Sequence, residues 1–272
     1  MKKFSTLLFS FLPFLVGLGL QFVLIFYYVF LSTFVLAFLP GNGNIDNLLE
    51  DLNFNILISI VWSIICSVFF GIWYYRSCGG DYKPNLKKNF HPLQLGGLVL
   101  LVPATQLATS VLIGIIASIF PKWLEDYEAL LESSGMGEEI SIFMLIYSVC
   151  LAPFSEELIF RGVTMRIARR AFPFWIANIL QAFLFGVFHM NMLQGCYAFA
   201  LGLILGYICE KGGSIYYSIL FHLLYNLWGT NSSWLNELPE EVLGTMVLAG
   251  TFILLPVGFV VFQHGIHKKE QQ

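Results

Sequence analysis

Long apolar stretches separated by short polar breaks make up most of this chain. A helix needs about 20 apolar residues to cross the hydrocarbon core of a bilayer. Reading the apolar runs between breaks gives candidate helices at residues 9–38, 54–75, 93–120, 141–165, 173–189, 192–209, 214–230 and 242–263. The pattern predicts an all-α, polytopic integral membrane protein with about eight transmembrane helices.

The runs differ in length, and the differences carry information. The first run is overlong and contains Pro13, which predicts a tilted helix or one that starts as an interfacial segment. The fifth to seventh runs are short and joined by tight turns, so residues 173–209 are expected to form a compact, partly broken helical hairpin. Residues 121–140 predict a short amphipathic helix that rests on the membrane surface rather than a substrate gate.

The composition agrees with a membrane protein and excludes other classes. Hydrophobic residues make up 57% of the chain and charged residues 11%, against about 25% charged in ordinary soluble domains. The net charge of −3 comes with no basic patch, so we expect no nucleic-acid partner and a lipid bilayer instead. The five cysteines are odd in number and form no CxxC pair, so neither a disulfide framework nor a zinc knuckle is supported.

The basic residues predict how the chain is oriented. With eight spans and both termini cytoplasmic, Lys122 lies outside and Arg161 lies within a span. All other Lys and Arg residues then lie inside, namely Lys2, Lys3, Arg76, Lys83, Lys87, Lys88, Arg166, Arg169, Arg170, Lys211, Lys268 and Lys269. This satisfies the positive-inside rule. We therefore expect a multi-pass protein of the cell membrane, or of the endoplasmic reticulum in a eukaryote.

Three charged residues stand inside the fourth apolar run, where each charge costs roughly 2.5–3.5 kcal/mol on insertion scales. Glu157 and Arg161 are four apart, so they share a helical face and can form an ion pair. Glu156 is rotated by about 100° from that face and has no evident partner on its own helix, which suits a general base. Pro153 removes one helical N–H and frees a carbonyl, which can kink the helix. The alternative is a purely structural salt-bridge network.

Further polar residues occur on neighbouring runs. His189 ends the fifth run, and His222 and Asn226 lie four apart on the seventh. A single histidine in an apolar helix is more often a satisfied core residue than a catalytic one, but this set together favours chemistry. A carboxylate base, two imidazoles and an amide can direct water onto an amide carbonyl and stabilise the oxyanion. The three runs converge only if the turn at 189–193 stays below the outer surface.

These motifs resemble a known family. The chain contains EExxxR from Glu156 to Arg161, FxxxH from Phe185 to His189 and HxxxN from His222 to Asn226, in that order on successive runs. Together they resemble the CPBP family of intramembrane proteases, also called the type II CAAX prenyl endopeptidase or Abi family. The resemblance covers roughly residues 141–230.

The resemblance implies an all-α membrane endopeptidase that uses a glutamate-activated water, and we expect no cofactor, with zinc as the alternative. By position, Glu156 resembles the base, while His189, His222 and Asn226 resemble the residues that position water and stabilise the oxyanion. Glu157 and Arg161 resemble supporting residues. Eukaryotic members trim prenylated CAAX proteins on the cytosolic side, whereas many bacterial members are associated with bacteriocin immunity or maturation. The expected partner is a membrane-anchored protein or peptide substrate.

Other interpretations of the same residues stay open. Glu156, His189 and His222 are a possible ligand set for catalytic zinc. A non-catalytic immunity or binding protein, or a transporter with a proton relay, also accounts for buried polar groups. We treat the chain as one membrane domain. Its parts are residues 1–140 with the first three spans and the outer amphipathic loop, 141–230 with the catalytic core, and 231–272 with the last span and cytoplasmic tail.

Overall fold

The computed structural model describes residues 2–38, 52–77, 90–136 and 140–270, and this part of the chain is helical without strands. The first half contains α1 (Lys2–Phe38), α3 (Leu52–Ser77), α5 (Pro92–Ile119) and the short α6 (Pro121–Ser133). A continuous helical rod follows, made of α7 (Ile142–Ile146), the π-helix η1 (Tyr147–Leu151), α8 (Ala152–Glu157), the π-helix η2 (Leu158–Met165) and α9 (Arg166–Arg169). We call this rod the central helix.

The remaining helices complete the bundle. They are α10 (Phe174–Phe188), α11 (Met192–Gly212), α12 (Ile215–Thr230), the 3₁₀ turn η3 (Ser233–Glu237), α13 (Glu240–Ala249), the π-helix η4 (Gly250–Leu254) and α14 (Leu255–Glu270). The all-α membrane class is confirmed, because six helices of the described chain are long and apolar enough to cross a membrane. The runs predicted at 173–189 and 214–230 are helical but shorter, with 15 residues in α10 and 16 in α12.

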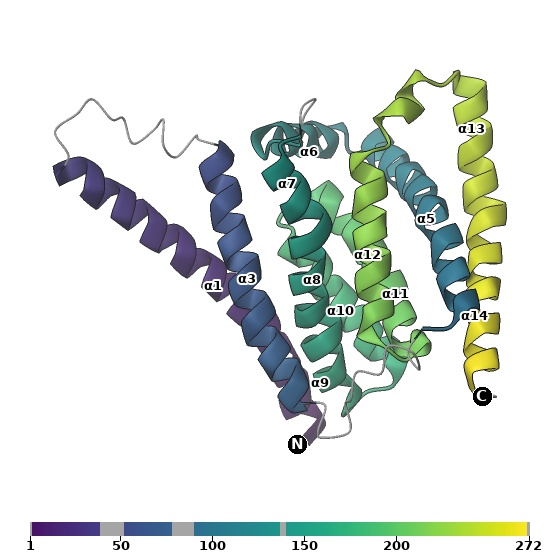
Figure 1. The fold of residues 1–272 in the computed structure, drawn as a ribbon, viewed down its shortest axis with the longest axis horizontal. Helices are drawn as coiled ribbons and strands as arrows, with labels where there is room; N and C mark the ends of the chain where they lie inside the picture. The colour runs from purple at the N-terminus through teal and green to yellow at the C-terminus, as the bar shows by residue number, and fades with distance from the viewer. Residues whose placement is uncertain (1, 39–51, 78–89, 137–139, 271–272) are drawn as a thin grey trace.

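The helices stand side by side, and α6 lies across one end of the bundle (Figure 1). Both termini lie at the opposite end. We call these the α6 end, near Ile119, Ile142 and Thr230, and the terminal end, near Arg169 and Gly212. Shared placement of the termini agrees with an even number of passes. The cytoplasmic location of the termini stays a prediction.

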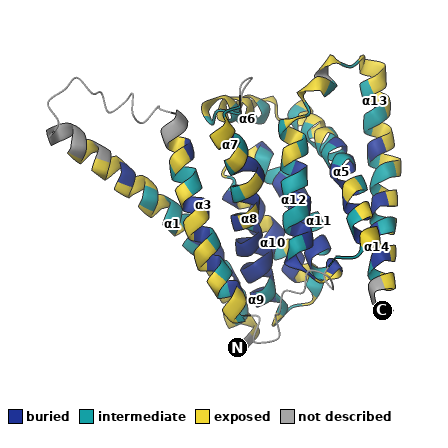
Figure 2. Ribbon diagram, viewed as in Figure 1, coloured by how far each residue is buried: buried dark blue, intermediate teal, exposed yellow. Residues whose placement is uncertain are grey.

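Burial is concentrated in the middle of the bundle, around the central helix (Figure 2). Every residue of η2 is buried, whereas Phe22, Phe26 and Phe30 on α1 are exposed, Phe26 by 73%. Large exposed apolar patches are rare on soluble monomers, but lipid tails are as apolar as these rings. The outer faces are therefore interpreted as lipid-facing.

Small residues bring α10 and α11 close together. A Cβ on Gly186 would lie 2.6 Å from the carbonyl oxygen of Gly195, and one on Gly202 would lie 3.0 Å from Ala182. Helices in membranes approach closely where glycines face each other. This contact makes the predicted hairpin compact, and it places the end of α10 beside the central helix.

Candidate active site

A local change of helix type opens the face of the central helix that carries the site. In η1 the Ala152 N–H bonds to the Tyr147 carbonyl, five residues back. With the same spacing, the Ser148 carbonyl would accept a hydrogen bond from the N–H of residue 153, but Pro153 has no N–H. Asn226 Nδ2 of α12 donates to that free carbonyl at 2.8 Å. The freed carbonyl expected from Pro153 is thus observed, and it ties α12 to the central helix.

The predicted ion pair is present and fully buried. Arg161 Nη1 donates to Glu157 Oε1 at 2.7 Å, and both side chains are 0% exposed. The same oxygen lies 3.0 Å from His222 Nδ1. Because an ionised carboxylate only accepts, Nδ1 carries the proton of this hydrogen bond. Glu157 therefore fixes the orientation of the His222 ring and directs its Nε2 elsewhere.

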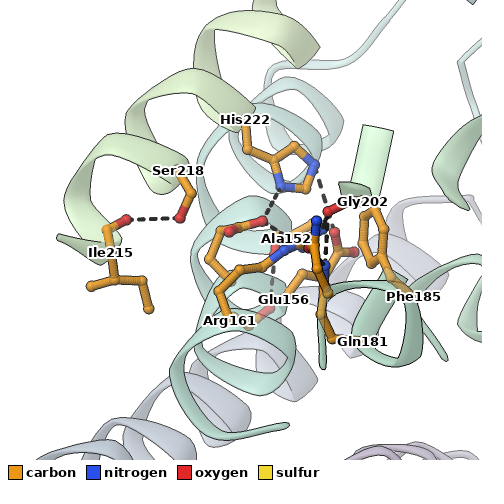
Figure 3. A network of polar contacts seen from close by, with 12 residues as sticks. Ala152, Glu156, Arg161, Gln181, Phe185, Gly202, Ile215, Ser218 and His222 are labelled. Atoms are coloured by element: carbon orange, nitrogen blue, oxygen red, sulfur yellow. Dashed lines mark hydrogen bonds and ion pairs between the residues drawn. The ribbon is translucent and has the colours of Figure 1, made fainter. Parts of the chain in front are cut away.

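Glu156 lies on the other side of that ring (Figure 3). His222 Nε2 is 3.8 Å from Glu156 Oε2, which is too long for a direct hydrogen bond. The Glu156 side chain keeps 12% exposure, unlike its fully buried neighbour Glu157. The ionisable neighbour of Glu156 is therefore His222 of α12. Residue spacing along the central helix could not reveal this neighbour.

His189 directly follows the last residue of α10, and one of its ring nitrogens is held by a backbone carbonyl. Its Nδ1 lies 2.8 Å from the Phe185 carbonyl, which can only accept, so Nδ1 donates and Nε2 remains available. The Phe185 ring packs edge-on against His189 with centroids 4.8 Å apart and against His222 at 5.8 Å. Its face lies 4.5 Å from the Arg161 guanidinium carbon. Phe185 therefore packs between three polar residues of the candidate site.

A second layer of buried amides lies behind Arg161. Gln181 Nε2 donates to the Gly202 carbonyl at 2.8 Å, and Arg161 Nη2 reaches the same oxygen at 3.3 Å. Gln181 also donates to Asn178 at 2.8 Å, and Asn178 donates to the Leu203 carbonyl at 3.0 Å. Neither amide was among the residues selected from the sequence. Their signal was two carboxamides, three residues apart, in an otherwise apolar helix.

One cavity of about 690 Å³ joins the candidate catalytic residues. Glu156, His189, His222 and Asn226 all line it, so the structure brings together the four residues singled out from the sequence. Glu157 and Arg161 are not among the lining residues and lie behind them. Further polar lining comes from residues that were not selected from the sequence, among them Gln106, Thr109, Tyr147, Gln194 and Tyr197.

The donor atoms of the cavity limit its chemistry. Both imidazoles use Nδ1 internally and keep Nε2, and Glu156 supplies a carboxylate. Such atoms can accept protons from water or bind a metal. Within the described residues, no three side chains of His, Cys, Asp or Glu are grouped closely enough to hold a metal ion as they stand.

Comparison with known proteins identifies this region. Residues 138–228 match the model of the Rce1-like family, described as type II CAAX prenyl endopeptidase Rce1-like. The match confirms the resemblance drawn from the motifs, and it contains all four cavity residues. The chain thus carries an Rce1-like domain, which supports a membrane endopeptidase of the CAAX-type intramembrane protease family. Searches of the curated proteins and of the solved structures found no match.

Proposed function

We propose that this protein is an intramembrane endopeptidase in which Glu156 activates water to hydrolyse a peptide bond of a membrane-associated substrate. The observation that carries the proposal is the single cavity shared by Glu156, His189, His222 and Asn226. The buried pair behind it supports the proposal, because a carboxylate 0% exposed and bound to both Arg161 and His222 is suited to hold a ring in place.

The proposed steps use the Glu156 carboxylate, the Nε2 atoms of both histidines and the second Nδ2 hydrogen of Asn226. Glu156 takes a proton from water as the water oxygen bonds to the substrate carbonyl carbon. The C–N bond then breaks, and Glu156 returns the proton to the leaving amine. With Nδ1 as the donor, the neutral form of each ring offers an Nε2 lone pair, through which it orients water by accepting one of its hydrogens. Asn226 uses one Nδ2 hydrogen on Ser148 and keeps the second for the oxyanion.

Zinc-assisted hydrolysis is the second candidate, because two free Nε2 atoms and a carboxylate are the donor types of catalytic zinc sites. In that case Glu156, His189 and His222 would hold the ion after their side chains move closer together. A non-catalytic binding protein is the third. The three candidates differ in what a chelator and a Glu156 variant do to activity.

The test uses purified protein in detergent with a quenched fluorescent farnesylated CAAX peptide. New peptide N-termini are also compared by mass spectrometry in cells that make wild type or Glu156→Gln. The exposed Glu128→Gln on α6 is the matched control. We expect Glu156→Gln to reduce peptidase activity by a factor of about 10²–10⁴, and the control variant to keep its activity.

Three outcomes separate the candidates. Cleavage that survives a chelator and depends on Glu156 supports the proposal. Cleavage lost to a chelator and restored by zinc replaces it with the metal mechanism. If wild type and Glu156→Gln give the same result both with the farnesylated peptide and with the new N-termini found in cells, the proposal fails. A non-catalytic binding protein is then favoured.

A further inference from the structure

The cavity occupies only the half of the bundle next to the α6 end. Its lining residues fall within 106–113, 127–136, 140, 144–156, 185–201, 222–235 and 243–247. On α5, α11 and the central helix these are the positions from mid-depth toward the α6 end. The cavity thus extends from Glu156 toward the end of the bundle that is opposite both termini.

Packed side chains close the cavity on the other side. All residues from Leu158 to Met165 are buried, and none of them lines the cavity. Phe160 and Phe185 pack edge to face with centroids 5.2 Å apart, just below the site. The ion pair of Glu157 and Arg161 lies in the same layer. Among the described residues, then, no lining position leads toward the terminal end.

Helix α6 borders the open side. Tyr127 and Leu131 of α6 contribute to the lining, and none of the α6 residues is buried. The Tyr127 hydroxyl lies 3.0 Å from the Tyr197 hydroxyl of α11. The amphipathic helix therefore rests at the entrance.

The two ends of the bundle carry opposite charge. Described basic residues at the terminal end are Lys3, Arg76, Arg166, Arg169, Arg170, Lys211 and Lys268, of which Arg169 pairs with the acidic Glu210. At the α6 end the described acidic residues are Glu125, Asp126, Glu128, Glu132, Glu237, Glu240 and Glu241. Lys122 is the basic residue described there, and it pairs with Glu125 at 3.3 Å and Asp126 at 2.9 Å. The positive-inside rule therefore predicts that the terminal end faces the cytoplasm.

From the cavity position and the charge asymmetry together, we infer that the cavity opens on the extracytoplasmic face of the membrane. The inference rests on the proposed function only for what it says of substrate. The substrate is then an exported or outer-leaflet-anchored peptide segment that reaches Glu156 from the α6 end. A prenylated CAAX terminus held in the cytoplasmic leaflet would be presented to the wrong face.

Site-directed labelling tests the sidedness without any need for turnover. The parent protein retains the buried Cys66 and Cys209 and has Cys78, Cys150 and Cys196 replaced by alanine. Single cysteines are introduced as Ser233→Cys at the entrance, Ala152→Cys in the cavity wall and, as the matched control, Ala171→Cys at the terminal end. A membrane-impermeant maleimide is applied to spheroplasts and, separately, to inverted membrane vesicles.

We expect Ser233→Cys and Ala152→Cys to be labelled at least about five-fold more in spheroplasts than in inverted vesicles, and Ala171→Cys to show the reverse. Preferential labelling of Ala152→Cys in inverted vesicles would overturn the inference, as would Ala171→Cys labelled from outside. If Ala152→Cys does not fold, the labelling ratio of Ser233→Cys decides between the two faces. The same ratios are expected in a Glu156→Gln background, so loss of peptidase activity and failure of the sidedness are distinguished.

Discussion

Removing Arg161 should destabilise the protein far more than removing a surface arginine. Arg161→Met keeps the side-chain length but leaves Glu157, 0% exposed, without its counter-charge. Breaking a buried pair by deleting one partner costs about 3–5 kcal/mol. The variant also loses the bond to the Gly202 carbonyl and the contact with the Phe185 face, of which the second is worth about 0.5–2 kcal/mol.

A double-mutant cycle isolates the charge effect. Replacing both partners, as Glu157→Gln with Arg161→Met, removes the uncompensated charge. We therefore expect the double variant to be about 1–3 kcal/mol more stable than Arg161→Met alone. The matched control is Arg169→Met, whose partner Glu210 is 31% exposed, and which should change stability by less than about 1 kcal/mol.

The measurement is reversible unfolding in mixed detergent micelles, followed by circular dichroism and checked by limited proteolysis. An Arg161→Met variant within about 1 kcal/mol of wild type would refute the reasoning, because then Glu157 is not held as a buried anion. A double variant that loses the sum of the two single losses would refute it as well, since that would mean the partners do not interact.

Single contacts support three more predictions. Asn226→Ala should lower kcat by about 10²–10³-fold, as loss of an oxyanion donor does, while Thr230→Ala one turn away should leave kcat unchanged; equal effects would contradict the assignment. Phe185→Leu removes the ring between His189, His222 and Arg161, so kcat should fall more than KM changes. Phe185→Tyr should restore part of the lost kcat, and an unchanged kcat in Phe185→Leu would speak against a positioning role for Phe185. Gly186→Ala puts a Cβ 2.6 Å from a backbone oxygen and should reduce thermal stability, whereas Gly19→Ala, with nothing within 4 Å, should not; similar melting temperatures would refute the close contact.

The features that could be predicted from sequence are those set by one helix at a time. Apolar runs located the helices, because hydrocarbon selects for apolar side chains over a fixed length. The pair of Glu157 and Arg161 followed from four-residue spacing, and Pro153 signalled a freed carbonyl. The first helix begins at Lys2 rather than at residue 9, since backbone hydrogen bonding continues past the apolar run.

The features that escaped prediction depend on how helices pack against each other. The bond from Asn226 to Ser148 requires the rotational setting of α12 against a π-helical turn, which no hydrophobic pattern reports. The Gln181 and Asn178 amides bond to carbonyls of α11, and only the close approach at Gly202 brings those carbonyls within reach. Sequence spacing identified the participants here, but not their partners.

Because the two glutamates are adjacent, the central helix places one carboxylate in the packed core and another at the cavity, at nearly the same depth. Consecutive helical residues point about 100° apart, so Glu157 turns into the packed core while Glu156 borders the cavity. Glu157 uses Oε1 for both Arg161 and His222, which fixes the ring whose other nitrogen faces Glu156 at 3.8 Å. For Glu156 and Glu157 to exchange these positions, the central helix would have to rotate by that angle. The contacts of Arg161 with α10 and α11 oppose such a rotation. Glu156→Gln and Glu157→Gln should therefore fail differently, the first in activity alone and the second in stability as well.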